Sequence, residues 1–208
     1  MLTRAAVILA GGLSKRFGQD KCLIRLARKP LILHVVDRVS AIVDEIAVVV
    51  GSSSQKEMFA TSLKSEAKIL VDKINMQNPL VGALTGFENI KADYSLLLPC
   101  DMPFVSRQVA TLLLDLCVGK GAAIPRWPNG YIEPLQSAYH VKSAVNAAQK
   151  ALGEGKLNLA SMIDNISGVR YISTLVLQQF DPKLLTFFNV NTPAEFKKAE
   201  LLLKTRPS

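Results

Sequence analysis

Three short runs of apolar residues constrain the fold of this chain more than any other feature of its sequence. The runs lie in Arg4–Ala10, Glu45–Val50 and Tyr94–Leu98, and each is followed at once by glycine or proline. Strands that are apolar on both sides occur in parallel sheets whose two faces are covered by helices, because such strands have no face to show to water. The runs therefore predict the buried central strands of a parallel sheet.

The stretches between these runs complete an α/β pattern. Alternating strands and helices favour a Rossmann-like three-layer αβα sandwich with a mostly parallel sheet. We expect one domain over residues 1–208, since no repeat, low-complexity tract or long linker divides the chain. The other expected strands are Lys68–Val71 and Ala122–Pro125, and the expected helices are Pro30–Ser40, Ser54–Leu63, Pro79–Lys91, Val105–Val118 and Lys142–Leu152.

The pattern changes after residue 125, where we expect a small hairpin insertion. The Asn129-Gly130 pair is a strong hairpin-turn signal, and Ile132–Tyr139 is typical of an extended segment. Nearer the end of the chain, Thr192-Pro193-Ala194-Glu195 offers an N-cap, a proline at the first helical position and a glutamate at the third. A helix should follow from there to about Leu203.

Composition excludes several classes of protein. The chain has 208 residues, 49% hydrophobic and 20% charged, which excludes an intrinsically disordered chain. Its apolar runs are far shorter than the ~18 residues of a membrane-spanning helix, so we expect a cytoplasmic protein with no membrane partner. Three cysteines without a CxxC pair argue against a disulfide framework or a structural zinc site. Cys100 and Cys117 are interpreted as small core residues.

The net charge of +8 fits either an ordinary solvated surface or an anionic partner. Aromatic residues make up only 6% of the chain and none lies within a basic run, which disfavours nucleic-acid binding by base stacking. Lys15, Arg16 and Lys21 instead gather around a glycine turn. This arrangement favours phosphate groups over a nucleic acid.

The glycine turn lies in Leu9–Lys21, directly after the first strand, where open α/β sheets bind ligands. Gly11 and Gly12 can adopt positive φ and allow the backbone to approach a ligand, and successive N–H groups in such a turn bind anions. Arg16 and Lys21 add positive charge suited to phosphate. The segment matches neither a Walker loop nor a GxGxxG fingerprint, and a solvated glycine turn remains the alternative.

Two further segments carry polar side chains near strand ends. Asp101 follows a buried strand and is flanked by Pro99 and Pro103; beside phosphates such a carboxylate is a natural Mg²⁺ ligand, although a turn or helix cap would use it equally well. Asn189 and Asn191 would point to the same side of an extended segment, towards a ligand, or would simply form a turn before the capped helix. His34 is expected to be packed, and no GxSxG elbow for a serine hydrolase is present.

Together these segments resemble the molybdenum cofactor guanylyltransferases, within the broader family of nucleotidyltransferases. Leu9–Lys21 is similar to the signature LAGGxSxRxGxDK, residues 79–82 to the GPLAG element, residues 99–103 to the metal-binding strand end, and residues 189–193 to the NVNTP segment. The similarity spans nearly the whole chain. The Gly11-Gly12 pair, in place of Ala-Gly, resembles the guanylyl branch of the family.

The resemblance implies GTP as donor, molybdopterin-bound molybdenum as acceptor and Mg²⁺ as cofactor. The terminal phosphate of molybdopterin would attack the α-phosphorus of GTP and release pyrophosphate. Arg16, Lys21 and the glycine-loop amides would neutralise charge, with no general base required. The residues implied are Leu9, Ala10, Gly11, Gly12 and Lys21 for GTP, Asp72 for the nucleotide, Asp101 for GTP and Mg²⁺, and Asn189 and Asn191 at the reaction centre.

Several alternatives remain open from the sequence. They are cytidylyl transfer to the same pterin, nucleotidyl transfer to a sugar phosphate, and a non-catalytic carrier of nucleotide or molybdopterin. Transient contact with other cofactor-biosynthesis or acceptor proteins is a further possibility. All of these functions require the glycine turn at Gly12 and the Asp101 carboxylate to face one shared cavity.

The chain also departs from the family pattern in three places. Asn78 replaces the first glycine of GPLAG, which puts the loop conformation in question. Gly51-Ser52-Ser53 stands where relatives often carry asparagine, and Lys156 stands where arginine is usual. These departures bear on nucleotide contact and on acceptor binding, respectively.

Overall fold

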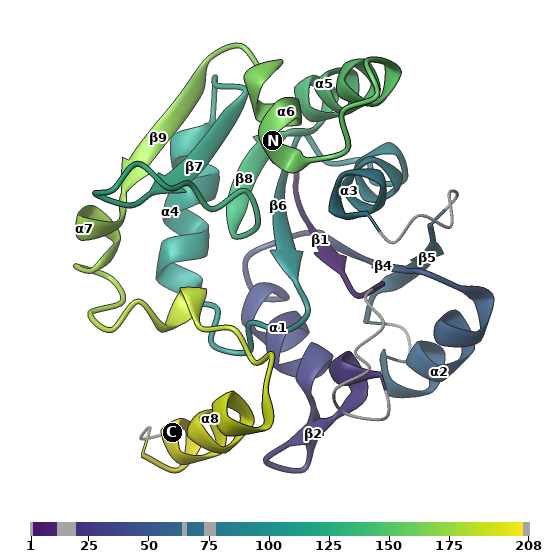
Figure 1. The fold of residues 1–208 in the computed structure, drawn as a ribbon, viewed down its shortest axis with the longest axis vertical. Helices are drawn as coiled ribbons and strands as arrows, with labels where there is room; N and C mark the ends of the chain where they lie inside the picture. Colours follow the sequence, from purple (N-terminus) through teal and green to yellow (C-terminus); the bar gives the residue numbers. More distant parts are fainter. Residues whose placement is uncertain (1, 12–19, 64–65, 73–77, 206–208) are drawn as a thin grey trace.

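A twisted sheet forms the centre of the protein. The computed structural model describes residues 2–11, 20–63, 66–72 and 78–205. Within this part of the chain, seven strands pair in the order β5-β4-β1-β6-β8-β7-β9 (Figure 1). The strands are β1 (Arg4–Leu9), β4 (Glu45–Val50), β5 (Lys68–Val71), β6 (Tyr94–Pro99), β7 (Ala122–Arg126), β8 (Ser137–His140) and β9 (Val169–Ser173).

The sheet is mostly parallel, as predicted. β1 lies between β4 and β6 and is parallel to both, β4 is parallel to β5, and β7 is parallel to β9. Only β8 runs the other way, antiparallel to β6 and β7. The carboxyl ends of β1, β4, β5 and β6 therefore meet at one edge of the sheet.

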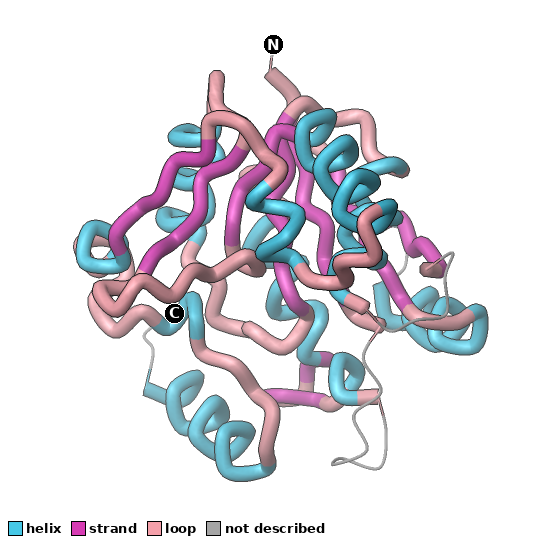
Figure 2. The backbone as a smooth tube through the Cα atoms, turned by 45° about the horizontal axis from the view of Figure 1, so that its top comes forward, coloured by secondary structure: helices cyan, strands magenta, loops and turns pink. Residues whose placement is uncertain are grey.

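Helices cover both faces of this sheet, which confirms the three-layer arrangement (Figure 2). The helices are α1 (Leu31–Val39), α2 (Ser53–Leu63), α3 (Pro79–Glu88), α4 (Arg107–Cys117), α5 (Val141–Gly153), α6 (Leu159–Asp164), α7 (Thr174–Leu177) and α8 (Pro193–Thr205). Two 3₁₀ turns, η2 (Lys21–Leu23) and η3 (Leu185–Phe187), and a short hairpin of β2 (Arg25–Leu26) and β3 (Lys29–Pro30) complete the described elements.

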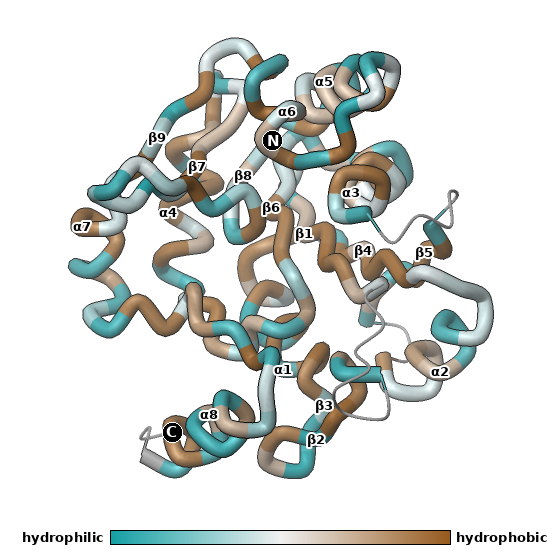
Figure 3. The backbone as a smooth tube through the Cα atoms, in the orientation of Figure 1, coloured by the Kyte–Doolittle hydropathy of each residue, from teal (hydrophilic) through white to brown (hydrophobic). Residues whose placement is uncertain are grey.

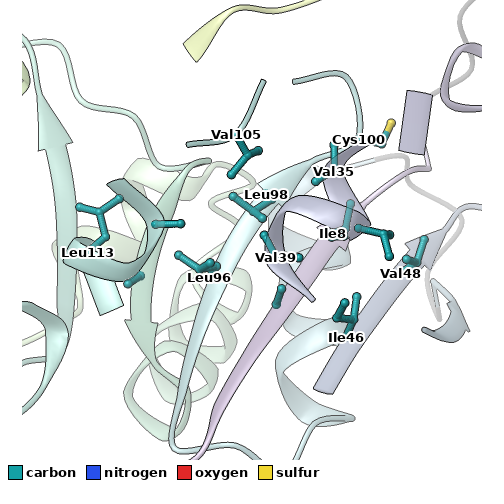
Figure 4. Packing of buried hydrophobic residues seen from close by; sticks show 14 of the residues in the cluster. Ile8, Val35, Val39, Ile46, Val48, Leu96, Leu98, Cys100, Val105 and Leu113 are labelled. Carbon is teal, nitrogen blue, oxygen red and sulfur yellow. The ribbon is translucent and has the colours of Figure 1, made fainter. Parts of the chain in front are cut away.

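The apolar strands separate two hydrophobic cores. Ala6 and Ile8 of β1 belong to the core shared with α1 and α4, whereas Ala5 and Val7 belong to the core shared with α3, α5 and α6. Successive side chains of a strand point to opposite faces, so a run without polar residues serves both cores. Figure 4 shows Ile8 beside Val35 and Val39 in the first core. Figure 3 shows that most of β1 and β4 is hydrophobic.

The insertion after residue 125 is a hairpin, as predicted. Arg126 forms an isolated antiparallel bridge with Ile132, and Gly130 occupies the turn with φ of +88°. The chain then returns as β8, and Gln136 donates its N–H to the Leu97 carbonyl oxygen at 2.7 Å. The hairpin thereby brings residues 133–136 to the carboxyl end of β6.

The C-terminal helix α8 packs outside the two main cores. A third cluster joins Ala199 of α8 to Leu26, Phe104 and Val190. Figure 1 shows α8 beside β2. This cluster fixes the segment that precedes α8 next to the end of β6.

The cysteines differ from expectation. Cys22 and Cys100 form a disulfide across a sequence separation of 78, contrary to the expectation drawn from the cysteine spacing; Cys100 is a buried core residue, as predicted. The prediction failed because sequence spacing does not reveal which distant cysteines a fold brings together. Cys117 is a buried free thiol, as predicted. Among the described residues, no helix is both long and apolar enough to span a membrane.

The helix α3 lies unusually close to β1 at Gly86. A Cβ added at Gly86 would lie 2.2 Å from Cγ1 of Val7, far inside van der Waals contact. The side chain of Val7 is branched and fully buried, so it cannot move aside. Glycine at this position therefore sets the distance between α3 and the sheet.

We expect Gly86→Ala to lower the free energy of unfolding by up to about 2 kcal/mol. Overpacking costs roughly 1–3 kcal/mol, while the better helix propensity of alanine returns about 1 kcal/mol. Gly153→Ala is the matched control, because a Cβ added at this helical glycine meets nothing within 4 Å. Urea unfolding of both variants checks this; equal stability of the two would contradict the packing argument.

Candidate active site

A pocket of about 250 Å³ opens at the edge where the carboxyl ends of β1, β4, β5 and β6 meet. Crevices at this edge are the usual ligand sites of open α/β sheets. The described residues that line it are Leu9, Gly11, Lys21, Cys22, Val49, Val50, Gly51, Asp72, Asn78, Pro79, Gly82, Pro99, Cys100, Asp101 and Leu135. Gly11 and Asp101 thus share one cavity. Gly12 and Arg16 lie outside the described residues, and their roles remain predictions.

A charged cluster lies on one wall of the pocket. The Lys21 ammonium donates to Asp101 Oδ2 at 2.6 Å and to Asn191 Oδ1 at 2.5 Å. Lys21 is only 9% exposed, so its charge acts in a partly desolvated setting where electrostatic interactions are stronger than in water. Three sequence-predicted residues, separated by up to 170 positions, therefore meet through direct hydrogen bonds.

Local structure sets the direction of Lys21. Asp20 is the N-cap of η2, and its carboxylate accepts a hydrogen bond from the Cys22 N–H at 3.0 Å. This cap places Lys21 in the first turn of η2, directed at the end of β6.

The segment that carries the asparagines runs alongside Asp101. The Val190 N–H donates to the Asp101 carbonyl oxygen at 2.9 Å, and Val190 is buried in the third cluster. Its neighbours Asn189 and Asn191 therefore extend from the other side of the segment, as the alternation predicted.

Two side-chain oxygens of this site are buried without a hydrogen-bond partner among the described residues. They are Asp101 Oδ1 and Asn189 Oδ1. A buried polar atom without a partner costs about 1–3 kcal/mol, so these two oxygens are suited to accept a ligand. Carboxylate and amide oxygens are ligands that Mg²⁺ accepts, and this donor set fits such an ion.

Gln55 of α2 joins two loops of the pocket, and sequence reasoning missed it. The Gln55 side chain accepts from the Gly51 N–H at 2.8 Å and donates to Asp20 Oδ2 at 2.6 Å. Gln55 is 5% exposed. Burial of Asp20 raises the pKa of its carboxyl group, and the hydrogen bond from Gln55 opposes this rise. No local pattern marks Gln55, because its partner Asp20 lies 35 residues away.

Gly11 is required by close approach and does not have positive φ. A Cβ on Gly11 would lie 3.1 Å from the Gly51 nitrogen, which is tighter than ordinary contact. The ends of β1 and β4 therefore touch through their backbones. Ala10 lies beneath the pocket, 1% exposed, with its N–H donated to the Val49 carbonyl oxygen.

Comparison with known proteins shows the family to which the chain belongs. A family model described as the MobA-like NTP transferase domain matches residues 6–168. This chain belongs to that family. It is therefore a nucleotidyltransferase.

The sequences of individual relatives align with almost the whole chain. A probable molybdenum cofactor guanylyltransferase of Methanosarcina mazei is 31% identical over 194 residues, which cover 91% of this chain and 86% of the relative. One of Bacillus mycoides is 31% identical over 198 residues and covers 94% and 95%. The crystal structure of molybdopterin-guanine dinucleotide biosynthesis protein A from Archaeoglobus fulgidus superposes with a TM-score of 0.82, at 26% identity over 97% of this chain and 100% of that one.

The departures from the family pattern have simple structural outcomes. Asn78 has extended backbone angles that any residue adopts; its side chain caps α3 at the Leu80 N–H, 2.8 Å, and donates to the Leu157 carbonyl oxygen at 2.7 Å. The loop therefore does not depend on glycine at position 78. Lys156 pairs with Glu154 at 2.9 Å and is not among the pocket-lining residues.

The remaining pocket residues come from separate elements. Asp72 follows β5, and its Oδ1 accepts from the Thr85 hydroxyl of α3 at 3.1 Å. Leu135 comes from the hairpin, where the neighbouring Gln136 is 3% exposed and donates to the Met102 sulfur at 3.1 Å. Sequence reasoning did not place this hairpin at the pocket.

His34 is packed as predicted, bonded to the Leu26 carbonyl oxygen, and burial lowers its pKa.

The capping box at the start of α8 holds the asparagine segment in place. Glu195 accepts from the N–H groups of Asn191 at 2.7 Å and Thr192 at 2.8 Å, and donates its own N–H to the Thr192 hydroxyl at 3.2 Å. The hydrogen bond from Asn191 is the main cause that lowers the pKa of Glu195.

A pH-dependent loss of stability should follow from this box. The carboxylate form of Glu195 is favoured in the folded state, so its contribution is present at neutral pH and is lost as pH falls below the usual glutamate value of 4.5. We expect Glu195→Gln to lower stability by about 0.5–1 kcal/mol at pH 7, with the gap to wild type closing towards pH 3–4. Thermal unfolding at both pH values checks this. Glu57→Gln, at an exposed position of α2, is the control; a gap at Glu195 that stays constant with pH would contradict the assignment.

Proposed function

We propose that this nucleotidyltransferase transfers GMP from GTP to the terminal phosphate of molybdopterin, with Mg²⁺ as cofactor and pyrophosphate as the second product. The observation that carries the proposal is the cluster of Lys21, Asp101 and Asn191 on the wall of the pocket. A fixed cation beside a carboxylate suits a triphosphate with its divalent ion. The relatives from Methanosarcina mazei and Bacillus mycoides are described as probable molybdenum cofactor guanylyltransferases, which supports guanylyl transfer to the molybdenum cofactor.

The reaction demands little covalent chemistry from the protein. A phosphate acceptor is already ionised at neutral pH, so it needs no general base. The residues must therefore hold donor and acceptor in line and neutralise the charge that they bring together. Lys21 supplies a positive charge that is largely shielded from solvent. Arg16 remains a predicted second source of positive charge.

Asp101 and Asn189 would hold the Mg²⁺ ion through the two oxygens that lack partners in the described chain. The ion, when bound, neutralises phosphate charge and acts as a Lewis acid. Asp101 has a second task, because its other oxygen orients Lys21. Asn191 shares this task from the opposite segment.

Another part of the pocket lining is proposed to select the base. Asp72 belongs to this part, together with Gly82, whose added Cβ would lie 3.3 Å from Leu9 Cδ2 and 3.8 Å from Asp72 Oδ2. Guanine presents adjacent N–H donors on its pairing edge, and an ionised carboxylate only accepts hydrogen bonds. We infer that Asp72 accepts from guanine. A cytoplasmic location and transient contacts with acceptor proteins remain predictions.

The decisive experiment compares nucleotides. With molybdopterin as acceptor, GTP should support Mg²⁺-dependent pyrophosphate release, and CTP, UTP and ATP should support far less. Preference for CTP would favour cytidylyl transfer to the same pterin. Turnover of a sugar phosphate in place of molybdopterin would overturn the proposed acceptor.

We expect Asp101→Ala to lower kcat by at least about 10²–10³-fold, because it removes both a metal ligand and the partner of Lys21. The affinity for nucleotide should fall only modestly, since the contacts proposed for Asp72 and the glycine turn remain. Steady-state kinetics and nucleotide titration together check this. Asp115→Asn is the matched control, because Asp115 pairs with Arg4 outside the pocket lining. Full activity of the Asp101 variant would remove Asp101 from the mechanism.

A further inference from the structure

The Cys22–Cys100 disulfide lies inside the pocket, and the proposed reaction makes no use of it. Cys22 belongs to η2 and Cys100 follows β6, with their Cα atoms 5.8 Å apart. Both cysteines line the pocket, although they are only 3% and 6% exposed. The disulfide therefore forms part of the wall of the cavity that would hold the nucleotide.

The disulfide and the charged cluster connect the same two segments. Cys22 directly follows Lys21, and Cys100 directly precedes Asp101. The Lys21–Asp101 ion pair, 2.6 Å, is thus a second link beside the covalent one. A change in the covalent link must alter how far the two charged groups can separate.

Cys117 provides a contrast within the same chain. It is fully buried in the core between the sheet and α4, and burial raises its pKa to about 12. The thiolate is the reactive form of cysteine, so Cys117 is inert at neutral pH. Of the three cysteines, only Cys22 and Cys100 are paired and line the pocket.

We propose that Cys22 and Cys100 form a redox modification site for low-molecular-weight thiols and disulfides, and that the disulfide form binds the triphosphate of the nucleotide more weakly than the dithiol form. This inference rests on the proposed function for the identity of the nucleotide. It adds a site that responds to the redox state of the surrounding thiol pool.

The chemistry is thiol–disulfide exchange. One cysteine thiolate attacks a sulfur of the small disulfide RSSR, forms a mixed disulfide and releases RS⁻; the second cysteine thiolate then displaces the second RS⁻. In sum, two cysteine thiols and RSSR give the protein disulfide and two RSH. Two electrons pass from the protein to RSSR, and the two thiol protons end on the released RSH.

Weaker binding in the disulfide form follows from the space between the charges. In the structure the Lys21 ammonium is held by Asp101 Oδ2 and Asn191 Oδ1. To contact a triphosphate as well, Lys21 must shift relative to the end of β6, and the cross-link between the neighbours of Lys21 and Asp101 restrains that shift. The dithiol form lets η2 move away from the end of β6.

Linkage then makes the effect reciprocal. If reduction strengthens nucleotide binding, bound nucleotide must make the disulfide easier to reduce by the same factor. A tenfold difference in affinity corresponds to about 30 mV in the reduction potential of a two-electron couple. The two quantities are measured separately, so their agreement is a strict check.

The test uses the full chain equilibrated in glutathione buffers of defined ratio, with the free thiols counted by alkylation and mass spectrometry. We expect Mg–GTP to bind about tenfold more tightly to the dithiol form, and guanosine, which lacks phosphates, to bind both forms equally. The reduction potential should rise by about 30 mV when Mg–GTP is saturating. Equal affinity for Mg–GTP in both forms, or a pair that stays unchanged across the whole range of buffers, would overturn the proposal.

Cysteine variants test whether the redox dependence of Mg–GTP affinity comes from Cys22 and Cys100. Cys22→Ser should show one affinity for Mg–GTP in every buffer, whereas Cys117→Ala should respond as wild type does. A response that persists in Cys22→Ser would contradict the assignment. Cys100→Ser serves if Cys22→Ser fails to fold, and the wild-type comparison needs no variant. Failure of the proposed function would look different, because GTP would then show no preference over CTP in either redox form.

Discussion

The parallel pairing of β1 with β4 on one side and β6 on the other is the constraint on which the site depends. It places the carboxyl ends of these strands at one edge, although they are tens of residues apart in the chain. The strand pairing alone then brings the residues just past the strand ends together. Gly11, Gly51 and Asp101 come together in this way. A connection running in the other direction would put one of them at the opposite edge.

The charged cluster of Lys21, Asp101 and Asn191 makes sense as a functional arrangement more than as a stabilising one. Burial of an ion pair carries a desolvation cost that can exceed the attraction between the charges. The cluster is also incompletely satisfied, since Asp101 Oδ1 lacks a partner among the described residues. The fold supports it through the N-cap at Asp20 and the capping box at Glu195.

Several parts of the fold were predictable because their signals are local. The strand Glu45–Val50 matches its prediction, and the Asn129-Gly130 hairpin and the capping box at Thr192 are confirmed. The β2–β3 hairpin was missed because Ala27 and Arg28 occupy its turn with positive φ, where glycine or asparagine is the usual signal. The strand β9 was missed because its burial is partial at this edge of the sheet.

The sequence by itself determined the buried strands, the layers they require and the polar residues that follow them, because hydrophobic periodicity and turn chemistry act over a few residues. Only the tertiary structure decided which distant groups touch. The pairing of Cys22 with Cys100, the bridge from Gln55 to Asp20 and the bond from Lys21 to Asn191 each join residues that are 35 to 170 positions apart. Such contacts depend on the packing of whole elements, which no local pattern encodes.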